Sequence, residues 1–126
     1  MSYDIEFCQH DEVCRLPFSP PHGGTYCLDD AFRDAWLNIT FNYASIFEKH
    51  HLSIVKRERQ KTGIRVLEGK TASKCVRILT GVIPKMGDET DPDYWKATEG
   101  NAKKALINLL MIAVAVPPDA ICRVSY

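Results

Sequence analysis

Apolar and acidic residues alternate over 3–8, which predicts a half-buried strand at the start of the chain. A second alternation over 12–16 predicts a partner strand, and the short link 9–11 between the two favours a hairpin. Proline and glycine residues predict a loop over 17–24, because they do not fit a central strand. The segment 25–28 is compatible with a third short strand, so this third of the chain is expected to form a small antiparallel sheet.

A stripe of large apolar residues at intervals of three and four follows over 32–47. After an N-cap at Asp29 or Asp30, this spacing predicts a helix. We expect the stripe to face the core; its members are Phe32, Trp36, Ile39, Tyr43 and Phe47. Asn38 and Asn42 fall on another face of that helix, where hydrogen-bonded structural amides are expected in preference to ligand-binding ones.

Two more helices are predicted in the second half of the chain. Thr71 is the N-cap of one, which extends through Met86 and turns Val76, Leu79 and Ile83 inward. Gly63–Leu67 before it is expected to form a short strand or turn.

The last helix has the widest apolar face. Asp91 is expected to cap a helical turn opened by Pro92, and the helix restarts at 98–101 and ends before Pro117. Its apolar stripe comprises Ala102, Ala105, Leu106, Leu109, Leu110 and Ala113. With an edge strand over 121–124, the pattern predicts an α+β fold in which a small antiparallel sheet packs against three main helices.

Composition and charge narrow the functional classes. The 126 residues are expected to form a single domain, 1–126, and 45% of them are apolar, which excludes disorder. Sixteen basic and sixteen acidic residues cancel, so nucleic acid is an unlikely partner. No signal peptide is visible, and the longest apolar run, 105–116, is shorter than the roughly twenty residues that a bilayer requires. A cytoplasmic location without membrane attachment is expected.

Basic residues are concentrated in the middle of the chain, where 32–85 holds eleven basic and four acidic residues. A solvated surface explains this run. The alternatives are a surface for phosphate groups and a surface that pairs with the acidic ends of the chain in a neighbouring subunit. The residues concerned are Lys56, Arg57, Arg59, Lys61, Arg65, Lys70, Lys74 and Arg77.

No pattern of metal ligation or catalysis is recognisable. Five residues near the start of the chain have the chemistry of metal ligands: Cys8, His10, Cys14, His22 and Cys27. Their spacing matches no known zinc site, so the three cysteines among them are expected to be reduced thiols without a metal. Gly69-Lys70-Thr71 lacks the spacing of a phosphate-binding loop. We therefore expect neither a metal nor a cofactor, and no enzymatic activity.

The segment 93–104 combines features of a nucleotide site. Tyr94 and Trp95 offer flat rings for stacking, and Asn101 can recognise a base edge or a ribose hydroxyl. Lys103 and Lys104 lie in the first turns of a helix, where cations are unfavourable unless an anion is near. The alternative is a helix corner with Trp95 in the core and a neighbouring glutamate, Glu99, neutralising the lysines.

Four stretches resemble a family of small phage and prophage proteins, the first type of Thoeris anti-defence sponge. They are Gly23-Gly24-Thr25-Tyr26, the run 35–43, Gly63-Ile64-Arg65 and the run 93–106. The resemblance implies a non-catalytic protein of the host cytoplasm that binds and sequesters cyclic ADP-ribose isomers, and in some members cyclic oligonucleotides. It also implies a homo-oligomer, a dimer or a hexamer, with pockets at subunit contacts.

The resemblance and the composition of 93–104 together define the candidate ligand-binding residues: Tyr94, Trp95, Thr98, Gly100, Asn101, Lys103, Lys104 and Arg65. In this set Tyr94, Trp95 and Asn101 match the region associated with base recognition, and Arg65 is the candidate phosphate ligand. The chain departs from the pattern before Pro117, where a basic residue is expected and Val116 stands. The alternative function is a protein-binding inhibitor of a host defence complex that uses the basic surface.

Overall fold

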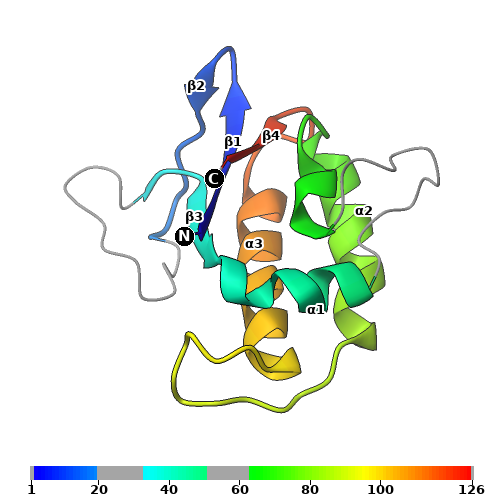
Figure 1. The fold of residues 1–126 in the computed structure, drawn as a ribbon. Coiled ribbons are helices and arrows are strands. Elements are labelled where there is room, and N and C mark those ends of the chain that lie inside the picture. The colour runs from blue at the N-terminus through cyan, green and yellow to red at the C-terminus, as the bar shows by residue number, and fades with distance from the viewer. Residues whose placement is uncertain (1, 20–32, 51–62, 126) are drawn as a thin grey trace.

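The computed structural model describes residues 2–19, 33–50 and 63–125. Within them, a four-stranded antiparallel sheet packs against three helices, so the predicted α+β class is confirmed (Figure 1). The strands are β1 (Ser2–Gln9), β2 (Glu12–Val13), β3 (Trp36–Thr40) and β4 (Ile121–Ser125). The helices are α1 (Ala44–Lys49), α2 (Ala72–Val82) and α3 (Glu99–Ala115).

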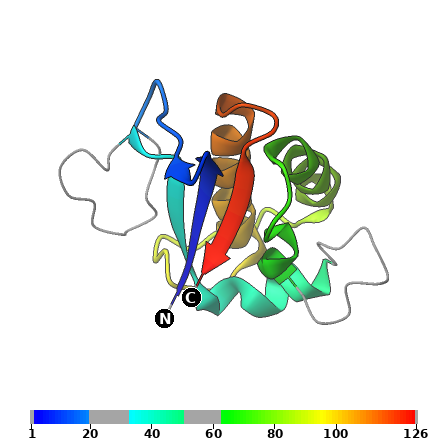
Figure 2. The same ribbon diagram turned by 90° about the horizontal axis from the view of Figure 1, so that it is seen from above.

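The first strand is the centre of the sheet. β1 pairs with β2 and β3 along one edge and with β4 along the other, and Figure 2 shows it between β3 and β4. The predicted hairpin between β1 and β2 is confirmed. Its turn residues, His10 and Asp11, both have positive φ, as a tight two-residue hairpin turn requires.

The helix predicted over 32–47 is wrong in its first part, because the chain forms β3 there. The residues of β3 from Leu37 to Thr40 are all buried, and β3 pairs with β1 in the register Ile5 to Leu37 and Tyr3 to Ile39. The aromatic residues that suggested helical spacing belong to different elements. Trp36 lies in the strand, whereas Tyr43 and Phe47 lie in the 3-10 helix Phe41–Tyr43 and in α1. Pairing with β1 overrides the local apolar spacing.

The helix capped by Thr71 is confirmed as α2, and its last turn is the 3-10 helix Ile83–Lys85. Of the residues predicted to face inward, Leu79 is fully buried, but Val76 and Ile83 are only half-buried. The buried face is rotated by about one residue from the expected one, and comprises Ala72, Cys75, Ile78, Leu79 and Val82.

One contiguous apolar core fills the space between the sheet, α2 and α3. The helix α3 contributes Ala102, Ala105, Leu106, Leu109, Ile112 and Ala113 to this core, and its alanines are small enough for the neighbouring elements to come close. Leu110, predicted in the same stripe, is half-buried and stands at its edge.

The remaining predicted elements are settled only in part. The segment Gly63–Leu67 is a 3-10 helix, which corresponds to the predicted turn and excludes a strand there. The predicted turn at Asp91 and Pro92 is not helical: the side chain of Asp91 accepts a hydrogen bond from the Asp93 amide instead. The proposed strand over 25–28 and the caps Asp29 and Asp30 lie outside the described residues.

Candidate functional site

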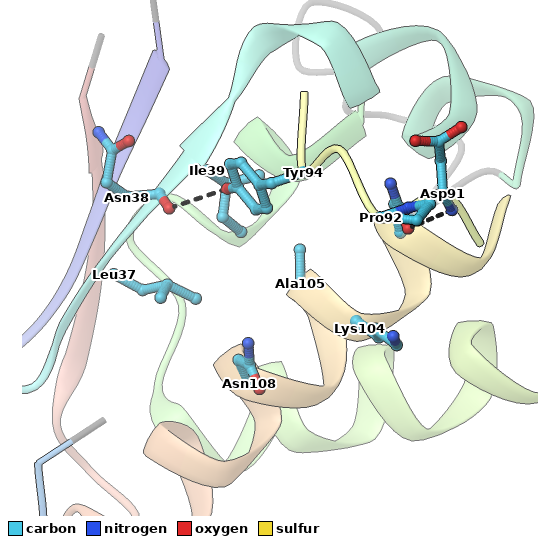
Figure 3. Close-up of a pocket in the computed structure, with 10 residues that line it drawn as sticks. Leu37, Asn38, Ile39, Asp91, Pro92, Tyr94, Lys104, Ala105 and Asn108 are labelled. Atoms are coloured by element: carbon cyan, nitrogen blue, oxygen red, sulfur yellow. Dashed lines mark hydrogen bonds between the residues drawn. The ribbon is translucent and has the colours of Figure 1, made fainter. Parts of the chain in front are cut away.

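A cavity of about 210 Å³ opens between β3, the segment that precedes α3, and α3 itself. Figure 3 shows side chains from all three segments around it. The lining residues are Leu37, Asn38, Ile39, Asp91, Pro92, Tyr94, Asn101, Lys104, Ala105 and Asn108.

Apolar side chains and one aromatic ring form the inner walls of the cavity. Leu37 and Ile39 are buried on the β3 side, and Ala105 is buried on the α3 side. The Tyr94 ring closes another wall, and its hydroxyl lies 3.5 Å from the carbonyl oxygen of Asn38. These groups provide an apolar surface for a flat ligand.

Tyr94 is held in place by Tyr43. The Tyr43 hydroxyl donates a hydrogen bond to the carbonyl oxygen of Tyr94, and the two rings meet edge to face with centroids 5.7 Å apart. Burial raises the pKa of Tyr43 to about 12. The 3-10 helix that precedes α1 therefore fixes the position of Tyr94 in the cavity wall.

Lys104 and Asn108 bring polar chemistry to the α3 side. They are four residues apart, so they lie one above the other on the same helix face. Among the described residues, neither the Lys104 ammonium nor the Asn108 amide has a hydrogen-bond or ion-pair partner. One cation and one amide are thus available to a ligand beside the Tyr94 ring. Asn108 is a site residue that the sequence reasoning missed, although it is the one polar interruption of the apolar run 105–116.

Asn101 lines the cavity, but its side chain is engaged with the chain itself. It is 6% exposed, its Oδ1 accepts from the amide of Asp91 at 3.1 Å, and its Nδ2 donates to the carbonyls of Asp93 and Lys96, each at 3.1 Å. Both amide hydrogens are therefore used. In this geometry Asn101 positions the segment 91–96, and hence Tyr94, and does not read a ligand.

Backbone amides at the N-terminus of α3 also find their hydrogen-bond acceptors within the chain. The Thr98 hydroxyl accepts from the Asn101 amide at 3.2 Å, and the Gly100 amide donates to the carbonyl of Glu89 at 2.7 Å. Because Gly100 has no side chain, another group can lie close to its backbone, and that group is the chain segment 88–90. Thr98 and Gly100 do not line the cavity.

The charged side chains at the start of α3 form two separate groups. Lys103 pairs with Asp88 at 2.7 Å, whereas Glu99 accepts from His50 Nε2 at 2.6 Å and lies 3.7 Å from the Lys49 ammonium. The alternative interpretation of the sequence, in which Glu99 neutralises Lys103 and Lys104, is therefore wrong. Lys103 forms its ion pair with Asp88, whereas Lys104 has no such partner among the described residues and lines the cavity.

Two further predicted residues lie away from the cavity. The Trp95 side chain is 51% exposed and packs edge to face on Tyr94, so it is not in the core. Arg65 is exposed on the 3-10 helix Gly63–Leu67, which contacts α1 and β4. The structure therefore brings Tyr94, Asn101 and Lys104 together, and leaves Arg65, Trp95, Thr98, Gly100 and Lys103 outside the lining.

The basic residues of the middle segment do not form one described surface. Lys74 and Arg77 are exposed on α2, and the Lys70 ammonium donates to the carbonyl of Val66 at 2.8 Å. Four of the eight residues, Lys56, Arg57, Arg59 and Lys61, lie outside the described part of the chain.

Of the five cysteines, Cys8, Cys14, Cys75 and Cys122 are described and are free thiols. In the described ranges no three histidine, cysteine or acidic side chains are grouped to hold a metal ion. His22 and Cys27, which share the ligand chemistry of the N-terminal group, lie outside those ranges. No helix in the described parts is both long and apolar enough to cross a membrane.

Comparisons of the chain with protein-family models, with curated proteins and with solved structures find no match.

Proposed function

We propose that the protein is a non-catalytic binding protein that takes up a small anionic nucleotide of the cyclic ADP-ribose class and sequesters it. The observation that carries the proposal is the placement of Lys104 and Asn108, which have no partner among the described residues, on the α3 wall of a cavity that also contains the Tyr94 ring. The resemblance of 93–106 to anti-defence sponges supports the same ligand class.

Each part of the cavity matches one part of such a ligand. A base packs against the Tyr94 ring and the apolar wall of Leu37 and Ile39. The Lys104 ammonium pairs with a phosphate oxygen, and the Asn108 amide donates to or accepts from a polar ring atom.

The size of the cavity limits how the ligand sits. At about 210 Å³ it is smaller than typical sites for drug-sized molecules, which begin at about 300 Å³. It therefore holds one base with its sugar, while the phosphates remain near the mouth. Self-association, which the resemblance implies, is a separate expectation, because a single chain supplies every lining residue.

The test is calorimetric titration of the purified protein with cyclic ADP-ribose isomers and, in parallel, with cyclic dinucleotides. We expect binding of at least one ligand, and recovery of that ligand intact after heat denaturation of the protein. Lys104→Ala should weaken this binding about tenfold or more, because it removes a charge-assisted contact.

Lys74→Ala is the matched control, since Lys74 is an exposed lysine on α2 and does not line the cavity. It should leave the affinity unchanged. Absence of binding to every ligand, or equal loss of affinity in both variants, contradicts the proposal. Recovery of a cleaved ligand shows an enzyme instead.

A further inference from the structure

Two buried cysteines meet where β4 lies against the start of α2. Cys75 and Cys122 are both fully buried, and both belong to the apolar core. The Cys122 thiol donates a hydrogen bond to the Cys75 sulfur, so the two sulfur atoms are in contact. Neither residue lines the cavity, so this pair is separate from the proposed ligand site.

The backbone holds this contact in place from both sides. β4 pairs with the segment that leads into α2, which Figure 2 shows beside it. The Cys122 amide donates to the carbonyl of Lys70, and the Cys122 carbonyl accepts from the Gly69 amide, each at 2.8 Å. One helical turn further on, the Cys75 amide donates to the carbonyl of Thr71 at 2.9 Å. Side chains of a helix lean toward its N-terminus, so the Cys75 sulfur is directed back toward β4.

We propose that Cys75 and Cys122 form a reversible disulfide bond when the protein meets a small disulfide oxidant such as glutathione disulfide, and that this bond ties β4 to α2. The two sulfur atoms, already in contact, then close to a bond length of about 2.0 Å. In the reduced protein β4 is held by its backbone pairing with β1 and with the segment 69–71, and four of its five residues are half-buried or exposed. The covalent link anchors β4 at Cys122, its buried position.

The order of the chemical steps follows from the surroundings of the two thiols. The hydrogen bond from Cys122 and the nearby Lys70 ammonium hold the pKa of the Cys75 thiol below its usual value, whereas the same hydrogen bond and burial raise the pKa of Cys122. The Cys75 thiolate attacks one sulfur of glutathione disulfide, and the first glutathione leaves as a thiolate. That thiolate takes up the proton released by Cys75.

The second step closes the bond within the chain. Cys122 gives up its proton and attacks the Cys75 sulfur of the mixed disulfide, and the second glutathione leaves and takes up that proton. Two protein thiols and one glutathione disulfide thus become one protein disulfide and two glutathione thiols. An excess of a dithiol reductant reverses the exchange.

The oxidant reaches the pair through local opening of the fold. Both thiols are fully buried, so exchange requires β4 and the segment 69–71 to separate for a moment. Parts of a fold with few buried side chains open locally at a lower free energy than the core does, and β4 has one buried residue among five. The disulfide, once formed, prevents the same opening.

The test is oxidation of the folded full chain with glutathione disulfide, followed by alkylation of the remaining thiols and digestion with trypsin without reductant. Trypsin places Cys75 in the peptide 75–77 and Cys122 in the peptide 105–123, and neither peptide contains another cysteine. We expect these peptides joined, with a mass about 2 Da below their sum because two hydrogen atoms are lost. The oxidised protein should melt about 5 °C or more above the reduced protein, and dithiothreitol should reverse both effects.

Cys8→Ala is the matched control, because Cys8 is another buried cysteine and lies outside the pair. This variant should keep the joined peptides and the rise in melting temperature, whereas Cys75→Ala and Cys122→Ala should lose both. Should these two variants fail to fold, the triple variant Cys8→Ala/Cys14→Ala/Cys27→Ala tests the same link, since it retains only the two paired cysteines.

Three outcomes overturn the proposal. One is a folded protein whose Cys75 and Cys122 thiols both remain open to alkylation on unfolding, after equilibration with glutathione disulfide. Another is a final product in which either cysteine is bonded to a different cysteine or to glutathione. The third is a joined peptide whose formation leaves the melting temperature unchanged.

Discussion

The backbone of Glu89 lies directly against the α-carbon of Gly100, and its carbonyl accepts a 2.7 Å hydrogen bond from the Gly100 amide. A methyl group at position 100 would meet that carbonyl and the Thr90 side chain well inside 3.0 Å. Gly100→Ala should therefore lower the free energy of unfolding by about 1–3 kcal/mol, the range of an overpacked position. Urea denaturation measures the change.

Gly81→Ala is the matched control for that clash. Gly81 lies inside α2, and an added methyl group there meets nothing within 4 Å. Relief of glycine's backbone entropy should raise stability by about 0.5–1 kcal/mol. Equal effects of the two substitutions would show that the 88–90 backbone does not press on α3.

Asn101→Ala should destabilise the fold and loosen the cavity wall. The substitution removes the acceptor for the Asp91 amide and the donor to the carbonyls of Asp93 and Lys96. Leaving these backbone groups without their partner costs about 1–3 kcal/mol. Hydrogen exchange should speed up at the amides of 91–96, whereas Asn108→Ala should leave exchange there unchanged.

Glu99 makes the stability dependent on pH in the acidic range. Burial of this carboxyl opposes ionisation, but the hydrogen bonds from His50 and from the Gly87 amide outweigh it, so the pKa of Glu99 lies below its usual value of 4.5. A carboxyl with a lowered pKa in the folded state stabilises the fold above its unfolded pKa, and this contribution is lost as the pH falls through the folded value.

Glu99→Gln is therefore expected to flatten the decline of stability with acidification. Melting temperatures measured from pH 7 down to pH 3 should fall more steeply for the wild type than for this variant. Parallel decline in both proteins would show that Glu99 titrates alike in the folded and unfolded chains.

Asn108→Ala should reduce ligand affinity about tenfold, the effect of losing one hydrogen bond of about 1.4 kcal/mol. The residue is half-buried, and no partner for its amide lies among the described residues, so stability should change by less than about 0.5 kcal/mol. Calorimetric titration and urea denaturation separate the two effects. Unchanged affinity would remove Asn108 from the site.

The fold was predictable where the local pattern and the tertiary contacts agree. Alternation over β1 and the Thr71 cap of α2 act locally, and both elements form where these signals stand. The helix α3 likewise begins within the predicted restart at 98–101. β3 was wrongly predicted as a helix because its residues fit both the two-residue period of a strand and the three- and four-residue spacing of a helix. Leu37 and Ile39 alternate as a strand requires, while the aromatic residues around them mimic a helix, and pairing with β1 decides.

Three of the eight residues predicted for the candidate site line one cavity, and the other five do not. Tyr94, Asn101 and Lys104 do converge on one cavity. Asn101 was assigned to a ligand because its sequence position cannot show that three backbone groups of 91–96 already use its amide. Asn108 was missed because it stands within the apolar run 105–116, and the sequence alone does not show that it lines the cavity.

The place of β1 in the sheet also constrains how the chain folds. β1 lies between β3 and β4 in the sheet. In the sequence it precedes both of these neighbours, and β4 is the last of the described elements to be translated. The early strand must therefore keep one edge unpaired until β4 has been synthesised. Long-range pairing of this kind slows folding and leaves one edge of β1 open until β4 pairs with it.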